Sequence, residues 1–450
     1  MHGKKVDLFD SLIWILLVWI VFQDFFLGIF YRVTGHALLT NLMFYSKDVL
    51  MVLLFAWAFI RNAFINRKII LWEVLFMCIF FFAAFNGMRQ GDVELKSILA
   101  SMRGILLLPV FVFVGYAIGD KVKFRKQFME RYMPFLVFVA LFGIADYMLD
   151  ITIGTKSFWT DFVGLGQYMA DIKGQAGRLV LGLPGNFYTY KNGVFFTQKR
   201  LVSFWGGPLT SAYALAVPCI YYFVIIMNTE NRFYGYIKVN RLTKFVGFAV
   251  CALAIALSHT RAMLLLVGMF LVIYYFVKTK KFEYIAYAAP FVILIVFMFS
   301  SKIWGYLYNG STIGHINGIA NSIIHLSFFG DGIGSFGVNS AQGTESTYIT
   351  MMGQMGVVGV ILYAMGFLIP LYYCSRKFKK EKMDRLTTVL ILSTLVYAVS
   401  GVISEQLTAY TTIAPYYILV GCEIGYLLGY EVKEEKCGGL YDSRNCAGQL

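Results

Sequence analysis

The sequence predicts an all-α polytopic membrane protein with about 12 transmembrane helices, both termini cytoplasmic and two long outer loops. Hydrophobic residues make up 59% of the 450 residues and charged residues only 14%, whereas a soluble domain has about 25% charged residues. The 39 Lys and Arg residues outnumber the 25 Asp and Glu residues, and most of them fall in segments that this layout makes cytoplasmic. The net charge of +14 is therefore interpreted as topological, and no nucleic-acid partner is expected.

Apolar runs of about 20 residues, the length that crosses a bilayer, recur along the chain. They predict spans at 11–31, 42–60, 69–86, 97–119, 132–150, 208–227, 244–258, 262–277, 283–300, 347–374, 386–404 and 413–430. The first run is long and no small-residue cleavage site ends it, so it is interpreted as a span and not as a signal peptide. Residues 1–430 are then one transmembrane bundle, and residues 431–450 are a cytoplasmic tail.

The run 244–277 is too long for a single crossing and contains the polar break Ser258-His259-Thr260-Arg261. Basic residues flank it on both sides, with Arg241 before it and Lys278 after it. Two basic flanks on one side of the membrane require an even number of crossings. The run is therefore predicted to be a hairpin of two short helices, with its tip on the outer face.

Two predicted outer loops, 151–206 and 301–346, are much longer than the other outer connections. Long loops without linker composition are usually functional. No long cytoplasmic loop and no Walker A motif is present, so any chemistry is expected to face outward and to proceed without ATP. The Cys and His residues show no CxxC or HExxH spacing, so neither a metal nor another cofactor is predicted.

Several ionisable residues fall inside the predicted spans, towards their outer ends. A charge at the centre of a spanning helix costs roughly 2.5–3.5 kcal/mol of insertion free energy, so charges within spans need an explanation. Two explanations are open: a water-accessible cavity that opens to the outside, or a structural role in which several residues are interfacial or form ion pairs, for example Asp48 with Arg103. The residues concerned are Asp24, Lys47, Asp48, Arg103, Asp146, His259, Arg261 and Glu405.

Three local patterns stand out on the predicted outer face. They are Arg200-Leu-Val-Ser203-Phe-Trp-Gly206-Gly207-Pro208, then Ser258-His259-Thr260-Arg261, and then Gly330-Asp331-Gly332-Ile-Gly334 followed by Glu345-Ser346-Thr347-Tyr348. Their order and spacing resemble the bacterial O-antigen ligase/polymerase superfamily. That resemblance implies a GT-C-like membrane glycosyltransferase that acts on glycans carried on undecaprenyl pyrophosphate.

The resemblance can be followed residue by residue. Arg200 matches the first arginine of the family, and Gly330–Gly334 matches its Gly-rich stretch. Ser258–Arg261 matches the Ser-x-x-Arg type hairpin, although His259-Thr260 interrupts the usual Ser-Arg pair. Ligases typically carry a His at the start of the last motif, where this chain has Glu345. The departure favours a Wzy-type polysaccharide polymerase over a ligase.

The expected chemistry fits these residue types. A lipid-linked donor leaves as pyrophosphate, and arginine keeps its charge and can contact phosphate in bidentate fashion. Arg200 and Arg261 are therefore predicted to stabilise the leaving group, and Glu345 is predicted to activate the acceptor hydroxyl as a general base. The predicted substrate-binding residues are Arg178, Lys199, Ser203, His259 and Tyr348.

Structural roles remain open for the same residues: Arg200 as a snorkelling interfacial residue, Arg261 as a cap of the turn and Glu345 as a helix N-cap. The expected reaction is metal-independent, inverting transfer of a growing glycan onto a lipid-linked repeat unit, outside the bacterial cytoplasmic membrane. The expected partners are these lipid-linked glycans, membrane lipids and a chain-length regulator. A ligase that uses another acceptor, or a flippase for the lipid-linked unit, is the alternative. The two halves share no matching motif, which disfavours a transporter.

Overall fold

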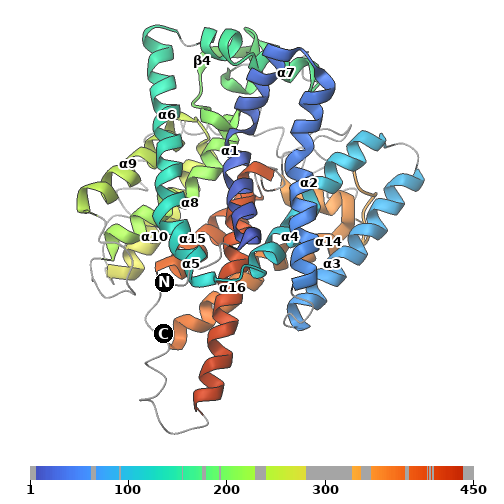
Figure 1. Ribbon diagram of the computed structural model, residues 1–450, viewed down its shortest axis with the longest axis vertical. Helices are drawn as coiled ribbons and strands as arrows, with labels where there is room; N and C mark the ends of the chain where they lie inside the picture. The colour runs from blue at the N-terminus through green and yellow to red at the C-terminus, as the bar shows by residue number, and fades with distance from the viewer. Residues whose placement is uncertain are drawn as a thin grey trace, which may run out of the picture.

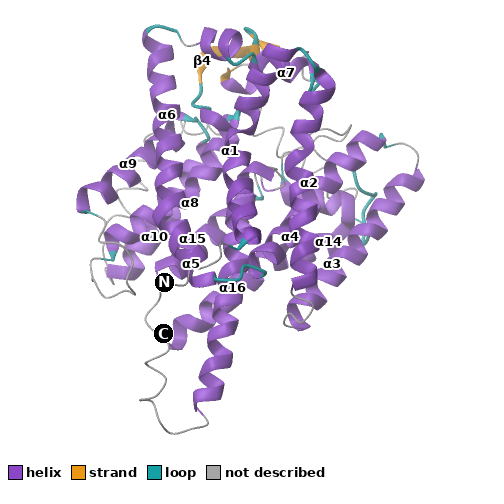
Figure 2. Ribbon diagram, viewed as in Figure 1, coloured by secondary structure: helices purple, strands orange, loops and turns teal. Residues whose placement is uncertain are grey.

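The computed structural model is helical almost throughout (Figure 2). It describes residues 7–61, 67–90, 93–154, 156–174, 179–191, 194–228, 240–279, 327–335, 346–380, 385–402, 404, 407 and 410–438. Within these residues, β structure is confined to two small antiparallel pairs, β1–β2 and β3–β4. The predicted all-α class is confirmed for the described part of the chain.

The elements keep the labels of Figure 1. The helices are α1 (Leu8–Thr34), α2 (Ala37–Arg61), α3 (Arg67–Gln90), α4 (Leu95–Tyr116), α5 (Lys121–Gln127), α6 (Met133–Thr152), α7 (Leu165–Asp171), α8 (Pro208–Met227), α9 (Arg241–Leu257), α10 (Arg261–Thr279), α14 (Thr347–Lys380), α15 (Arg385–Ser400) and α16 (Tyr410–Gly438). Shorter turns are the π-helical η1 (Phe128–Tyr132) and η2 (Phe158–Phe162) and the 3₁₀-helical η4 (Gly185–Phe187) and η5 (Ser203–Trp205). The strands are β1 (Leu179–Val180), β2 (Leu183–Pro184), β3 (Tyr188–Lys191) and β4 (Val194–Lys199).

Nine helical stretches among the described residues are long and apolar enough to cross a membrane. They are Leu8–Thr34, Ala37–Arg61, Leu71–Arg89, Ser97–Tyr116, Lys121–Thr152, Pro208–Met227, Arg261–Thr279, Thr347–Ser375 and Thr412–Gly429. Predicted spans 244–258 and 386–404 correspond to the shorter helices α9 and α15. Predicted span 283–300 lies outside the described residues. The chain is thus a multi-pass membrane protein.

The centre of the bundle is the packing of α16 against α4, and two glycines make it close. A Cβ added at Gly115 would lie 2.0 Å from the carbonyl oxygen of Ile418, and one at Gly421 would lie 2.0 Å from that of Val112. Small residues let helix backbones approach in this way. In lipid, where the hydrophobic effect does not drive helices together, the van der Waals contacts of such a close approach stabilise the pair.

The predicted span 132–150 begins earlier than expected, because α5, η1 and α6 form one continuous helix over Lys121–Thr152. Among the basic residues of its first turns Arg125 is buried in the bundle, where Glu423 of α16 supplies an opposite charge. The Arg125 Nε lies 2.6 Å from a Glu423 carboxylate oxygen, and Thr387 donates a further hydrogen bond of 2.9 Å to Glu423. A buried charge is tolerated when it is paired and hydrogen-bonded in this way.

The two ends of the bundle can be told apart. At one end the start of α1 meets the end of α2, where Asp7 pairs with Arg61 at 2.6 Å, and Gly119 after α4 lies beside both side chains. At the other end lie α7, β4 and the ends of α1 and α6 (Figure 1). We call this second end the loop end. The charge distribution predicts that it is the outer end.

The loop end carries a layer that we call the cap segment, which comprises the described residues of 156–200. Its residues Trp159, Tyr168 and Phe187 form a small apolar core together with Leu27 and Tyr31 of α1. Ion pairs join it to the bundle: Lys173 lies 2.9 Å from Asp24 of α1, and Lys199 lies 2.9 Å from Asp146 of α6. The predicted pair of Asp48 with Arg103 is also present, at 3.6 Å. For these residues the structure favours ion pairing over a water-filled cavity as the reason for intramembrane charge.

Candidate functional site

Arg200 joins the cap segment to the turn between α9 and α10. Its Nε donates a hydrogen bond of 2.8 Å to the carbonyl oxygen of Ser258, and a terminal nitrogen lies 3.3 Å from the Thr260 hydroxyl. The other terminal nitrogen lies 3.3 Å from the carbonyl oxygen of Asn186. The first two sequence motifs are therefore neighbours in space, as their predicted common face required.

The turn itself is tightly held. The backbone N–H of Leu201 donates to Leu257, at 3.0 Å, and the Ser258 hydroxyl accepts a bond of 3.3 Å from the N–H of Thr260. His259 has a φ of +52°, in the left-handed region that residues with a Cβ seldom adopt. The helix break falls where the polar residues predicted the tip of a hairpin.

Positive charge concentrates at this turn, because Arg200, His259 and Arg261 lie within electrostatic range of one another. Burial, and then the charge of Arg261, lower the pKa of Arg200 to about 10, so its guanidinium stays charged at neutral pH. Burial, and then Arg200 and Arg261, lower the pKa of His259, so its imidazole is neutral at pH 7. We call these three residues the basic cluster.

The Gly-rich stretch of the third motif packs against a break in α14. Gly356 has a φ of +70°, which interrupts the helix, and the Gly-rich stretch fills the gap. The N–H of Asp331 donates to Gly353 at 2.7 Å, and the N–H of Val357 donates to Ser327 at 3.3 Å. A Cβ at Gly356 would lie 2.2 Å from the carbonyl oxygen of Phe328, so the close approach requires glycine.

The start of α14 is tied to the end of α15. The Ser346 hydroxyl lies 3.1 Å from the carbonyl oxygen of Gly401, and the Tyr348 hydroxyl donates to Ala398 at 2.8 Å. Helix α15 in turn contacts both α8 and α10. Arg261 is the first residue of α10. The predicted residues Glu345 and Arg178 lie outside the described residues.

Two other predicted substrate-binding residues have structural partners. The side chain of Lys199 is 4% exposed and pairs with Asp146, which also accepts a 2.9 Å bond from the Trp159 indole. Ser203 is fully buried, has a φ of +54° and donates to the carbonyl oxygen of Val139 at 2.6 Å. Lys199 and Ser203 therefore hold the cap segment and η5 in place.

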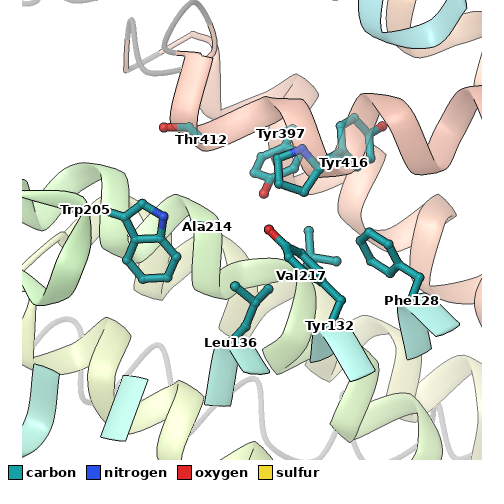
Figure 3. Close-up of a pocket in the computed structure, with 10 residues that line it drawn as sticks. Phe128, Tyr132, Leu136, Trp205, Ala214, Val217, Tyr397, Thr412 and Tyr416 are labelled. Carbon is teal, nitrogen blue, oxygen red and sulfur yellow. The ribbon is translucent and has the colours of Figure 1, made fainter. Parts of the chain in front are cut away.

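A narrow aromatic-lined pocket lies deeper in the bundle (Figure 3). Its lining residues are Phe128, Tyr132, Leu136, Trp205, Ala214, Val217, Tyr397, Thr412, Pro415 and Tyr416. Trp205 and Thr412 are 3% and 2% exposed, and neither the indole N–H nor the hydroxyl has a hydrogen-bond partner in the described part of the chain. Apart from Trp205, these residues belong to no sequence motif, and only the fold brings them together.

The basic cluster is suited to binding an anion that carries several oxygens. It combines two guanidinium groups, an imidazole and the N-terminus of α10, whose first N–H groups have no partner within the helix. Arginine and helix N-termini are the groups that recur around bound phosphates. No protein-family model matches the chain, and no curated protein matches it.

Proposed function

We propose that this protein is a polysaccharide polymerase, a membrane glycosyltransferase that moves a growing glycan from undecaprenyl pyrophosphate onto a lipid-linked repeat unit. The reaction would take place outside the bacterial cytoplasmic membrane. The single observation that supports this most is the contact of Arg200 with the turn that precedes Arg261. It brings two arginines from distant parts of the chain to one end of a multi-pass bundle.

The position of the basic cluster supports a lipid-linked donor. Arg261 is the first residue of α10, and Arg200 leads through η5 into α8, so both lie where membrane-spanning helices end. The pyrophosphate of a lipid whose tail lies in the bilayer would be held at this level. Charge-assisted hydrogen bonds to its oxygens would stabilise the negative charge that develops as the sugar leaves.

The acceptor side of the proposal depends on Glu345. Its neighbour Ser346 is anchored to the end of α15, which contacts α10. In the proposed reaction the Glu345 carboxylate would accept the proton of the acceptor hydroxyl during direct, metal-independent transfer with inversion. Arg178 and Tyr348 are proposed to contact the glycan or its phosphate.

The test is in vitro polymerisation of undecaprenyl-pyrophosphate-linked repeat units by the purified protein in lipid nanodiscs, with products resolved as a ladder. Arg261→Gln is expected to slow ladder formation about a hundredfold, the usual cost of removing a group that stabilises transition-state charge. Arg241→Gln is the matched control, since Arg241 is exposed at the far end of the same hairpin.

Each alternative gives a different result. Transfer of glycan to another acceptor, without ladder growth, would indicate a ligase. Movement of the lipid-linked unit across a vesicle membrane, without a new glycosidic bond, would indicate a flippase. An Arg261→Gln variant with a wild-type ladder would remove Arg261 from the mechanism.

A further inference from the structure

We propose that His259 binds the phosphate of the lipid-linked substrate through Nε2 and takes up one proton from solvent as the phosphate binds. The proton returns to solvent when the phosphate is released, and no covalent bond to His259 forms or breaks. This inference rests on the proposed function, because it assigns a role within the same basic cluster. His259 is among the predicted substrate-binding residues, and the contact through Nε2 with its proton uptake specifies a role that the resemblance does not give, since the family pattern is interrupted at His259.

The first observation is the backbone at His259. A φ of +52° is uncommon for a residue with a Cβ, and glycine would adopt it at lower cost, although histidine and asparagine adopt it more readily than most residues. The conformation is imposed from both sides, since Arg200 contacts the carbonyl of Ser258 and the hydroxyl of Thr260. A strained residue that its surroundings hold so firmly is typical of a functional site.

The second observation is a polar atom without a partner. His259 Nε2 is buried and makes no hydrogen bond in the part of the chain that the structure describes, whereas its backbone N–H donates to Ala256 at 3.0 Å. Burying an unpaired ring nitrogen is unfavourable. A phosphate oxygen bound in the basic cluster would supply the missing acceptor for Nε2–H.

The third observation is the charge around the imidazole. The charged groups that act on it are Arg200, from the segment after β4, and Arg261, from α10, and both oppose protonation. A phosphate bound among the three residues adds negative charge and reverses that effect, since an opposite charge favours the protonated form. The pKa of His259 is therefore higher in the complex than in the free protein.

The sign of the pH dependence follows from this difference. Because the complex holds more protons than the free protein, affinity for phosphate is strongest at low pH. It falls by up to about tenfold for each pH unit as pH rises from the pKa of free His259 towards its pKa in the complex. Above both pKa values the extra affinity is absent.

The experiment is titration calorimetry of the full-length protein with a short-chain prenyl pyrophosphate, at several pH values between about 6 and 8.5, where an imidazole titrates. Two buffers of different ionisation enthalpy report the protons taken up. The ligand also titrates, so the readout is the difference between wild type and His259→Asn. We expect wild type to take up more protons than the variant and to bind about tenfold more tightly near pH 6, the effect of one charge-assisted hydrogen bond.

A folding control separates a binding role from a structural one. The variants are His259→Asn and His259→Gly. Glycine relieves the positive φ and asparagine tolerates it much as histidine does, so neither variant is expected to unfold at a lower temperature than wild type, while both should bind the pyrophosphate more weakly. If both variants unfold at a lower temperature, or if proton uptake matches wild type, the inference is overturned.

The outcomes also distinguish this inference from the proposed function. Polymerisation without any His259-dependent proton uptake would refute the role of His259 and leave the polymerase intact. His259-dependent uptake without polymerisation would support the phosphate site and refute the polymerase. Absence of pyrophosphate binding by the wild-type protein would refute both.

Discussion

Lys199 shows how a basic residue beside a functional motif can belong to the scaffold. It immediately precedes Arg200 in the sequence, yet its amine is buried between Asp146, at 2.9 Å, and Asp150, at 3.8 Å. Arg200 points instead to the α9–α10 turn. Two adjacent cations thus have separate roles, one in attaching the cap segment and one in the basic cluster.

Lys199→Met is expected to lower the free energy of unfolding by about 3–5 kcal/mol, because it leaves the buried carboxylate of Asp146 without its cation. Thermal unfolding of the detergent-purified protein would measure the loss. Lys156→Met, at an exposed position of the same cap segment, is the control and should unfold as wild type does. A wild-type melting temperature for Lys199→Met would show that the pair does not hold the cap segment.

The pair of Asp7 with Arg61, at the end of the bundle away from the loop end, is expected to make the stability of the fold depend on pH. A hydrogen bond from Arg61 lowers the pKa of Asp7 below its ordinary value of 3.8. A depressed pKa contributes stability that is present above the ordinary value and is lost as pH falls through the folded-state value. The pair is about one third exposed, so its contribution is at most about 1 kcal/mol.

Asp7→Asn should therefore unfold at a slightly lower temperature than wild type at pH 7. The difference should disappear as pH falls below 3.8. Melting temperatures of the two proteins across the acidic range would test this. Asparagine keeps an acceptor for the N–H of Phe9 at the start of α1, so a difference that persists in strong acid would contradict a role through the charge of Asp7.

Helix α14 illustrates what a single glycine does at the scale of an element. Its break at Gly356 creates unpaired backbone groups, and residues 327–335 satisfy some of them by backbone hydrogen bonds. The same residues also approach α3, where the N–H of Ile333 donates to Ala83 at 3.2 Å. The Gly-rich motif therefore joins α14 to α3, and the helix break and the loop depend on each other.

Gly356→Ala is expected to cost about 1–3 kcal/mol from the positive φ alone, with a further cost from the clash with Phe328. Gly268→Ala in α10 is the matched control, because a Cβ there meets nothing within 4 Å and alanine is the better helix former by about 1 kcal/mol. The melting temperature should therefore fall for Gly356→Ala and rise for Gly268→Ala. Equal melting temperatures would contradict the tight fit at Gly356.

For the whole molecule, composition and hydropathy were sufficient for the class of protein and for nine of the predicted spans. The polar break in 244–277 was sufficient to predict the turn between α9 and α10. Hydropathy and a polar break can both be recognised in a short stretch of sequence. Among ion pairs between residues distant in sequence, Asp48 with Arg103 was predicted. Arg125 with Glu423 and Lys173 with Asp24 were not, because only the fold brings them together. The same holds for the aromatic pocket, whose members come from four separate parts of the chain.

The hydrogen bonds of Arg200 have a consequence for the cost of binding. A guanidinium carries five N–H groups, and three of its nitrogens already donate to Ser258, Asn186 and Thr260. Within the described part of the chain, one N–H on each terminal nitrogen has no further partner, and the plane of the guanidinium is already fixed. A ligand meeting this two-pronged group would not have to immobilise a long flexible side chain, so little rotamer entropy would be lost on association. A lysine at position 200 would keep the charge and lose that advantage.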